Sequence, residues 1–256
     1  MGGATAITHD PLLLLAVAGA GFAAGALNAV AGSGSLITFP VLLALGYSPL
    51  VANVSNTVGL FAGNVSGAVG YRRELAGQRR AALTLGACAL VGGLGGAGLL
   101  LALPPTIFKV VVPALVLLAV VLLLLQPHLA RRRAAGPPTR GGRLALRAST
   151  FATGVYGGYF GAAQGVMFMA TLGVFLDESL QRLTGLKNVL ASAANGAAAV
   201  VFVVYGPVAW EPALVLAGSS LLGGQLGAGY GRRLPASVLR AVIIVGGLAA
   251  VLKLLL

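Results

Sequence analysis

The chain alternates long apolar runs with short polar connections. Runs of about 20 residues, the length at which a helix crosses a hydrocarbon core of about 30 Å, lie at 12–31, 50–71, 81–103 and 107–125, and again at 146–160, 180–205, 212–230 and 237–256. Two shorter apolar pieces, 36–45 and 166–176, follow the first and fifth runs. This pattern predicts an all-α polytopic membrane protein in which each short piece is the second part of a broken or re-entrant helix.

A glycine-rich break precedes each short piece. The first break reads Ala31-Gly32-Ser33-Gly34-Ser35, and the second reads Phe160-Gly161-Ala162-Ala163-Gln164-Gly165. Glycine permits positive φ and close backbone approach. Irregular backbone at membrane depth persists only inside protein or beside a water-filled cavity. The two breaks are therefore candidate functional positions.

The second half of the chain repeats features of the first half in the same order. Gly92-Gly93, Gly96, Gly98 and Leu103-Pro104 match Gly223-Gly224, Gly227, Gly229 and Leu234-Pro235 at one constant offset; Asn56 also matches Asn188. Such a collinear series indicates an internal duplication. We predict an N-terminal transmembrane repeat over residues 1–126, a basic linker over 127–147 and a C-terminal transmembrane repeat over 148–256. Each repeat would contain a broken first helix and three further transmembrane helices.

The basic residues favour opposite orientations of the two repeats. If each short piece returns the chain to the side on which the preceding run began, fourteen of the 17 Lys and Arg residues fall on one side. If each broken run is instead one straight crossing, four arginines of the second half move to the other side: Arg182, Arg232, Arg233 and Arg240. Cytoplasmic loops carry an excess of Lys and Arg. The charges therefore predict inverted repeats, a cytoplasmic linker and both termini outside.

Composition agrees with a surface that faces lipid. Charged residues make up 9% of the chain and hydrophobic residues 58%, whereas soluble domains carry about 25% charged residues. A net charge of +12 would suggest a nucleic-acid partner in a soluble protein. Here the arginines flank apolar runs, so we interpret them as topology signals and lipid headgroup contacts and predict no nucleic-acid partner.

Catalytic and metal-binding groups are scarce within the runs. The acids, Asp10, Glu74, Asp177, Glu178 and Glu211, lie at run ends or in connections, and His9 and His128 lie outside the runs. The single cysteine, Cys88, offers neither a disulfide nor a cysteine metal site. The sequence therefore predicts no enzymatic activity, no catalytic residues, no metal and no cofactor.

The breaks and the polar residues near them predict an anion site. The start of a helix presents unpaired N–H groups and the positive end of its dipole. Two such starts that meet near the membrane midplane would bind an anion, with polar side chains of the breaks and of the following runs completing the site. The predicted substrate-binding residues are Asn28, Gly32, Ser33, Gly34, Ser35, Asn53, Asn56, Gly161, Gln164, Gly165, Lys187 and Asn188.

Several of these positions could instead have a purely structural role. Small residues can serve only to pack helices tightly. We favour that interpretation for the later glycines, Gly92, Gly93, Gly96, Gly223, Gly224 and Gly227, but not for the breaks, where serine and glutamine accompany glycine. Lys187 lies about one helical turn from Arg182. It could extend to the cytoplasmic surface, or it could point inward and add a positive charge to the site.

The residues around the first break resemble a known family signature. The stretch from Gly25 to Leu42, Gly-Ala-Leu-Asn-Ala-Val-Ala-Gly-Ser-Gly-Ser-Leu-Ile-Thr-Phe-Pro-Val-Leu, resembles the glycine-rich first signature of the sulfite exporter TauE/SafE family. The segment Ala52-Asn-Val-Ser-Asn-Thr, the central basic loop, the second break and the late Gly-Gly-x-x-Gly segments are similar to that family as well. The resemblance covers nearly the whole chain. It implies a permease of the bacterial inner membrane for sulfite, sulfonates or related organic acids.

The resemblance also implies positions for the family motifs. By position, the glycine-rich breaks of the family fall on Gly32, Gly34, Gly161 and Gly165, and the first-motif proline falls on Pro40. Two departures bear on the substrate. Ser33 and Ser35 replace part of the usual glycine run, and Met169 stands where a second proline would repeat Pro40.

Together these observations predict a secondary transporter of small sulfur-containing or organic anions. It would work by alternating access, with a small anion and the lipid bilayer as its partners, and a homodimer is compatible with this architecture. A passive anion channel and a permease for a non-sulfur organic acid stay open as alternatives. A cation permease would need acids or aromatic residues at depth, and a non-transporting scaffold would tolerate bulky apolar residues at the breaks.

Overall fold

The computed structural model describes residues 11–131 and 139–230, and every regular element within them is a helix. The helices are α1 (Pro11–Val30), α2 (Ser35–Ala44), α3 (Pro49–Gly70), α4 (Arg79–Ala102), α5 (Pro105–Arg131), α6 (Arg140–Tyr159), α7 (Gln164–Phe175), α8 (Leu180–Tyr205) and α9 (Trp210–Tyr230). The predicted all-α class is confirmed. The last predicted run, 237–256, and the Leu234-Pro235 pair lie outside the described residues.

By length and composition, four of the described helices can cross a membrane. They are α1, α4, α8 and the part of α5 from Pro105 to Leu122. Helices α3, α6 and α9 have 22, 20 and 21 residues but a more polar composition. In α3 the asparagines Asn53, Asn56 and Asn64 are all buried. Polar residues in membrane helices normally face the protein interior, so α3 is suited to the middle of the bundle.

The helices extend into the predicted linker from both sides. Helix α5 continues to Arg131, and α6 already begins at Arg140. The hydroxyl of Thr139 accepts a hydrogen bond from the backbone N–H of Gly142 at 3.1 Å, which caps the start of α6. The arginines and prolines of residues 127–147 suggested a loop throughout. A threonine that follows two prolines is also a good start for a helix, and here Thr139 starts α6.

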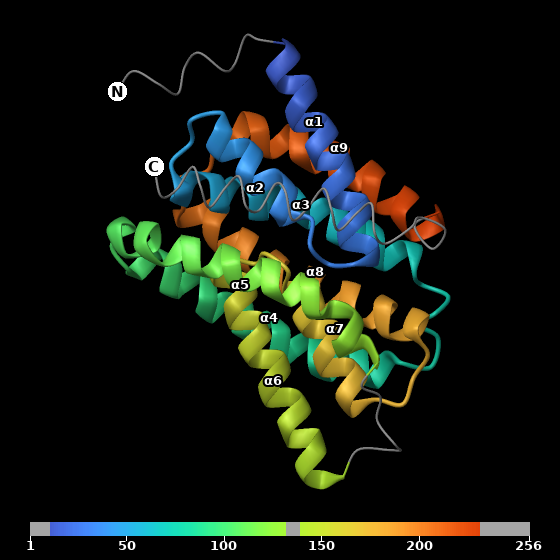
Figure 1. Cartoon of the computed structure of the whole chain (residues 1–256). Helices are drawn as coiled ribbons and strands as arrows, with labels where there is room; N and C mark the ends of the chain where they lie inside the picture. The colour runs from blue at the N-terminus through green and yellow to red at the C-terminus, as the bar shows by residue number, and fades with distance from the viewer. Residues whose placement is uncertain (1–10, 132–138, 231–256) are drawn as a thin grey trace.

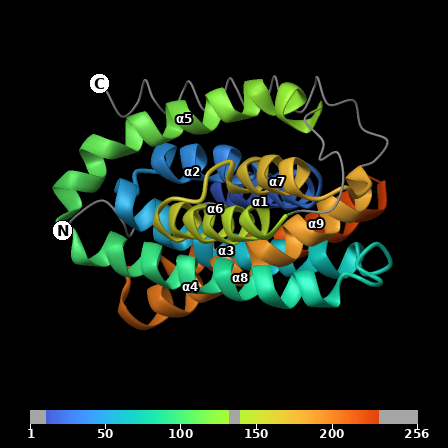
Figure 2. The same cartoon turned by 90° about the horizontal axis from the view of Figure 1, so that it is seen from below.

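Two sets of three long helices meet at the centre of the bundle (Figures 1 and 2). Helix α9 packs on both α1 and α3, and α4 packs on both α6 and α8. The two sets meet where α3 packs on α8. Each short helix, α2 or α7, packs on the long helices before and after it in the chain, and α5 packs along α7 (Figure 2). This arrangement brings the two breaks close to the α3–α8 contact.

Glycines let α4 and α9 approach their neighbours closely. A Cβ atom on Gly93 would overlap the carbonyl oxygen of Ala194 in α8, and one on Gly224 would lie 2.5 Å from the carbonyl oxygen of Gly63 in α3. Four more glycines meet backbone in the same way, Gly92 and Gly96 against α6 and Gly223 and Gly227 against α1. The predicted packing role of these glycines is confirmed.

We expect Gly93→Ala to lower the unfolding temperature and Gly95→Ala not to lower it. Both changes add one methyl group to α4 and gain about 1 kcal/mol of helix propensity. The methyl group at position 93 must displace the backbone of α8, and overpacking costs about 1–3 kcal/mol. A Cβ at Gly95 has nothing within 4 Å. Thermal unfolding of the purified protein in detergent compares the two variants, and equal unfolding temperatures would contradict the prediction.

Candidate functional site: the meeting point of the two helix breaks

The two breaks touch each other directly. The backbone N–H of Gly165, in the first turn of α7, donates a hydrogen bond of 3.0 Å to the carbonyl oxygen of Gly32. A Cβ atom on either glycine would overlap the Cα atom of the other. Gly32 and Gly161 both have φ of +77°, a conformation that glycine adopts at little cost. Glycine is thus required here both for the turn in each break and for the contact between them.

The side chain of Asn28 holds the first break in shape. It lies in the last turn of α1, and its Oδ1 accepts a hydrogen bond of 2.6 Å from the backbone N–H of Gly34. Gly34 is packed so closely that a Cβ atom would overlap the carbonyl oxygen of Ala24. The chain therefore leaves α1, turns at Gly32 and enters α2 in a fixed geometry.

Two asparagines of α3 link both breaks. Asn56 donates from Nδ2 to the hydroxyl of Ser35 at 3.1 Å and accepts a hydrogen bond from the hydroxyl of Thr38, both in α2. Asn53 donates from Nδ2 to the carbonyl oxygen of Tyr159 at 3.0 Å, at the end of α6. Both asparagines are almost fully buried. One face of α3 thus contacts the start of α2 and the end of α6.

Lys187 and Asn188 of α8 contact the end of α1, just before the first break. The Nζ of Lys187 donates to the carbonyl oxygens of Asn28 at 2.6 Å and Ala29 at 3.2 Å. The Nδ2 of Asn188 donates to the same Ala29 oxygen at 3.0 Å. Carbonyl groups in the last turn of a helix lack partners within that helix, and its dipole favours a cation there.

Lys187 therefore points inward and does not reach the surface. Its exposed fraction is 0%. At the surface, the neighbouring Arg182 forms an ion pair with Glu178 at 2.6 Å and donates to the carbonyl oxygen of Ala76. The structure thus separates the two basic residues that sequence alone could not distinguish.

The second break has its own polar residues, on the side of α6. The side chain of Gln164 lies against Gly157, and its Nε2 is 3.5 Å from the carbonyl oxygen of Thr153. The hydroxyl of Tyr156 donates to the carbonyl oxygen of Ala162 at 2.6 Å. Gln164 and Gly161 are therefore not in the polar cluster that Asn28, Asn56 and Lys187 form around the first break.

Most backbone donors at the starts of the short helices already have partners. Gly165 donates to Gly32, Gly34 donates to Asn28, and Val166 donates to Ala163. The N–H groups that we expected to be open are thus satisfied within the protein, that of Gly165 by the other break and those of Gly34 and Val166 by nearby groups. Of these donors, the Gly165 N–H would become free if Gly32 and Gly165 moved apart.

Some buried polar atoms at the breaks have no partner among the described residues. They are Ser33 Oγ, Asn53 Oδ1 and Asn195 Oδ1. Ser33 is 1% exposed and lies within the first break, and a buried polar atom without a partner is costly. The Asn195 oxygen lies 3.9 Å from the place of a Cβ atom on Gly161. Asn195 and Thr38 were not among the predicted site residues, although Asn195 follows Asn188 by about two helical turns on the same helix.

Aromatic rings cover one side of the breaks. The ring of Phe160, in the second break, packs edge-on against Phe39 of α2, with centroids 5.3 Å apart. Phe108 of α5 lies 6.3 Å from Phe160 and 5.7 Å from Tyr159. Phe39, Phe108 and Phe160 are buried. These rings provide an apolar wall beside the polar cluster.

Comparison with known proteins identifies the family. Residues 17–254 match the model of the family described as sulfite exporter TauE/SafE. The chain is 29% identical over 256 residues to the probable membrane transporter protein YfcA of Escherichia coli K12, covering 96% of this chain and 91% of that protein. It is 26% identical over 241 residues to the probable membrane transporter protein ORF9 of a Sinorhizobium species, covering 92% and 90%.

A third relative, a probable membrane transporter protein of Haemophilus influenzae, is 27% identical over 213 residues, or 81% of each chain. No solved structure matches the chain. The family match spans most of the chain, and the relatives match it over 81–91% of their own length. The chain therefore belongs to the TauE/SafE family and is a multi-pass membrane transporter rather than an enzyme.

Proposed function

We propose that this protein is a secondary transporter of small sulfur-containing or organic anions, such as sulfite or sulfonates. The observation that carries the proposal is the direct contact between the two glycine breaks at Gly32 and Gly165, beside a cluster of buried polar side chains. Hydroxyl, amide and ammonium donors lie there, most of them bonded to the protein, and the long helices around the breaks contain no Asp or Glu at depth. Once released from these partners, such donors suit an oxyanion.

The packing supports a duplicated architecture. The pairing of α1 with α9 corresponds to that of α6 with α4, and the pairing of α3 with α9 corresponds to that of α8 with α4. We infer two repeats, over 1–126 and 148–256, joined by the basic segment 127–147. The arginine distribution favours opposite orientations, with the linker in the cytoplasm and both termini outside the bacterial inner membrane.

The proposed mechanism separates the two breaks and brings them together again. When Gly165 leaves Gly32, its N–H group and the hydroxyl of Ser33 become available to an anion. Lys187 contributes positive charge from α8, and Asn56 and Asn188 hold the ends of the broken helices. One repeat then moves against the other, so that the site opens to one side of the membrane at a time.

Counterflow in proteoliposomes tests the proposed function. Vesicles are preloaded with unlabelled sulfite and diluted into labelled sulfite, with taurine, sulfate and acetate as competitors. A carrier gives transient accumulation of label, whereas a passive channel only equilibrates it. Strong competition by acetate alone would indicate that the substrate is a non-sulfur organic acid. No counterflow with any of these anions would contradict the proposal.

We expect Asn56→Leu to lower the initial counterflow rate by about tenfold or more. The change removes two hydrogen bonds to α2, each worth about 1 kcal/mol. Ser35→Ala removes one of them and should have a smaller effect. The control is Ser219→Ala, since within the part of the chain that the structure describes the hydroxyl of Ser219 bonds to the backbone of its own helix. Wild-type rates in a well-folded Asn56→Leu protein would contradict the placement of the site.

A further inference from the structure

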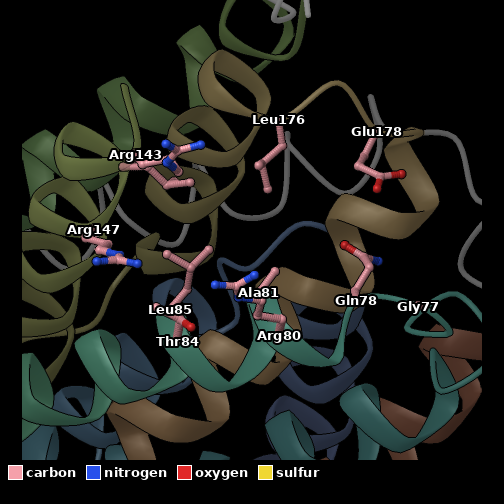
Figure 3. A pocket seen from close by; sticks show the side chains of 11 residues that line it. Gly77, Gln78, Arg80, Ala81, Thr84, Leu85, Arg143, Arg147, Leu176 and Glu178 are labelled. Carbon is pink, nitrogen blue, oxygen red and sulfur yellow. The ribbon is translucent and has the colours of Figure 1, made fainter. Parts of the chain in front are cut away.

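A second polar site lies at the end of the bundle where α4 and α6 begin. Among the described residues, a cavity of about 660 Å³ opens there between these helix starts and the α7–α8 connection (Figure 3). The α3–α4 and α7–α8 connections lie side by side at this end (Figures 1 and 2), and the side chain of Gln78 donates to the carbonyl oxygen of Arg182 at 3.2 Å. None of the residues that line the cavity belongs to the two breaks.

Positive charge dominates the wall of this cavity. Arg80 of α4 and Arg143 and Arg147 of α6 line it, and their guanidinium groups lie around the same open space in Figure 3. Arg143 and Arg147 are four residues apart, so they share one face of α6. The one acid in the lining, Glu178, is already paired with Arg182 at 2.6 Å. Arg80 and Arg147 place positive charge on two helices that line the same cavity, and both would attract a bound anion.

The rest of the lining is apolar or hydroxylic. Leu85 and Leu146 are buried, Leu176 and Ala81 line the cavity beside them, and Thr84 adds a hydroxyl group. A polar anion above an apolar wall therefore fits the cavity. A water molecule in the liquid occupies about 30 Å³. The cavity, at about 660 Å³, therefore has room for an anion much larger than a water molecule.

We propose that this arginine cavity binds a phosphate-bearing anion. Guanidinium groups form paired hydrogen bonds with phosphate oxygens and are the side chains best suited to that geometry. Two sources carry the same chemistry: the headgroup of an acidic phospholipid, since the cavity opens at an end of a membrane bundle, and a soluble phosphate. This site is separate from the breaks, and the proposal does not depend on the identity of the transported anion.

Binding to purified full-length protein tests the proposal. Native mass spectrometry measures retention of phosphatidylglycerol against phosphatidylcholine, and equilibrium dialysis measures labelled inorganic phosphate. The test variant is R80Q/R147Q, which removes two charges from the cavity wall. The matched control is R72Q/R73Q, which removes two exposed charges from the α3–α4 connection outside the cavity. All four side chains are exposed, so both variants should fold.

The expected result is a loss of affinity of about tenfold or more in R80Q/R147Q, and little change in R72Q/R73Q. Selective loss of phosphatidylglycerol would identify a lipid site, and selective loss of inorganic phosphate would identify a soluble ligand. Added salt should weaken either ligand, because exposed charges are screened. Equal affinities in the two double variants, or no binding of either ligand to the unmodified protein, would overturn the proposal.

Discussion

Gly165→Ala is expected to reduce sulfite counterflow by at least about tenfold, while Gly95→Ala leaves it unchanged. A methyl group at position 165 would overlap the Cα atom of Gly32 and push the two breaks apart. Gly165 has no positive φ, so alanine fits its backbone conformation and the effect comes from the contact alone. The hydrogen bond of 3.0 Å between the two breaks would be lost with it.

The measurement is the initial rate of labelled sulfite counterflow at equal protein content. Gly95→Ala adds the same methyl group to α4 where nothing lies within 4 Å, so it controls for the change of glycine to alanine. Gel filtration of both variants checks that they are folded. Full activity of Gly165→Ala would mean that the close approach of the breaks is not needed in the transport cycle.

Lys187→Met is the second change with a large expected effect. Methionine nearly preserves the volume but removes the ammonium group that donates to the carbonyl oxygens of Asn28 and Ala29, of which the Ala29 oxygen keeps the Nδ2 of Asn188 as a donor. A buried group left without its partner costs about 1–3 kcal/mol, so the unfolding temperature should fall. Loss of the only positive charge near the breaks among the described residues should also weaken sulfite binding, by about tenfold or more.

The matched control for this change is Lys109→Met. Lys109 is exposed near the start of α5, so its replacement should alter neither stability nor binding. Thermal unfolding and equilibrium binding of labelled sulfite measure the two effects separately. A Lys187→Met protein that unfolds earlier but binds sulfite as tightly as before would restrict Lys187 to a structural role.

The sequence located the breaks well because their signal is local. Glycine with positive φ at positions 32 and 161 follows from residue type and from the short apolar helix after each break. The tight contacts of Gly93 and Gly224 also followed a local rule, since small residues mark close helix packing in membranes. Both features can be predicted from residue type, although the glycine contacts themselves join distant parts of the chain.

Side-chain directions could not be predicted in the same way. Lys187 and Arg182 are both basic and lie about one turn apart, and only the packing of α8 against α1 decides that Lys187 is buried. The side chain of Gln164 fills space beside Gly157, a contact that depends on how α6 and α7 fold back on each other. The N–H group of Gly165 is occupied because the two breaks meet, which a reading of each break by itself does not reveal.

The central claim is that an anion binds where the two breaks meet, and the hydroxyl of Ser33 tests it most directly. This hydroxyl is buried and has no hydrogen-bond partner among the described residues, so its removal breaks no hydrogen bond there. Equilibrium binding of labelled sulfite is measured for the unmodified protein, Ser33→Ala and the control Ser219→Ala. We expect Ser33→Ala to weaken binding by about tenfold or more, the effect of one hydrogen bond to a charged group, and Ser219→Ala to bind normally. Unchanged affinity in a folded Ser33→Ala protein would contradict an anion site at the breaks.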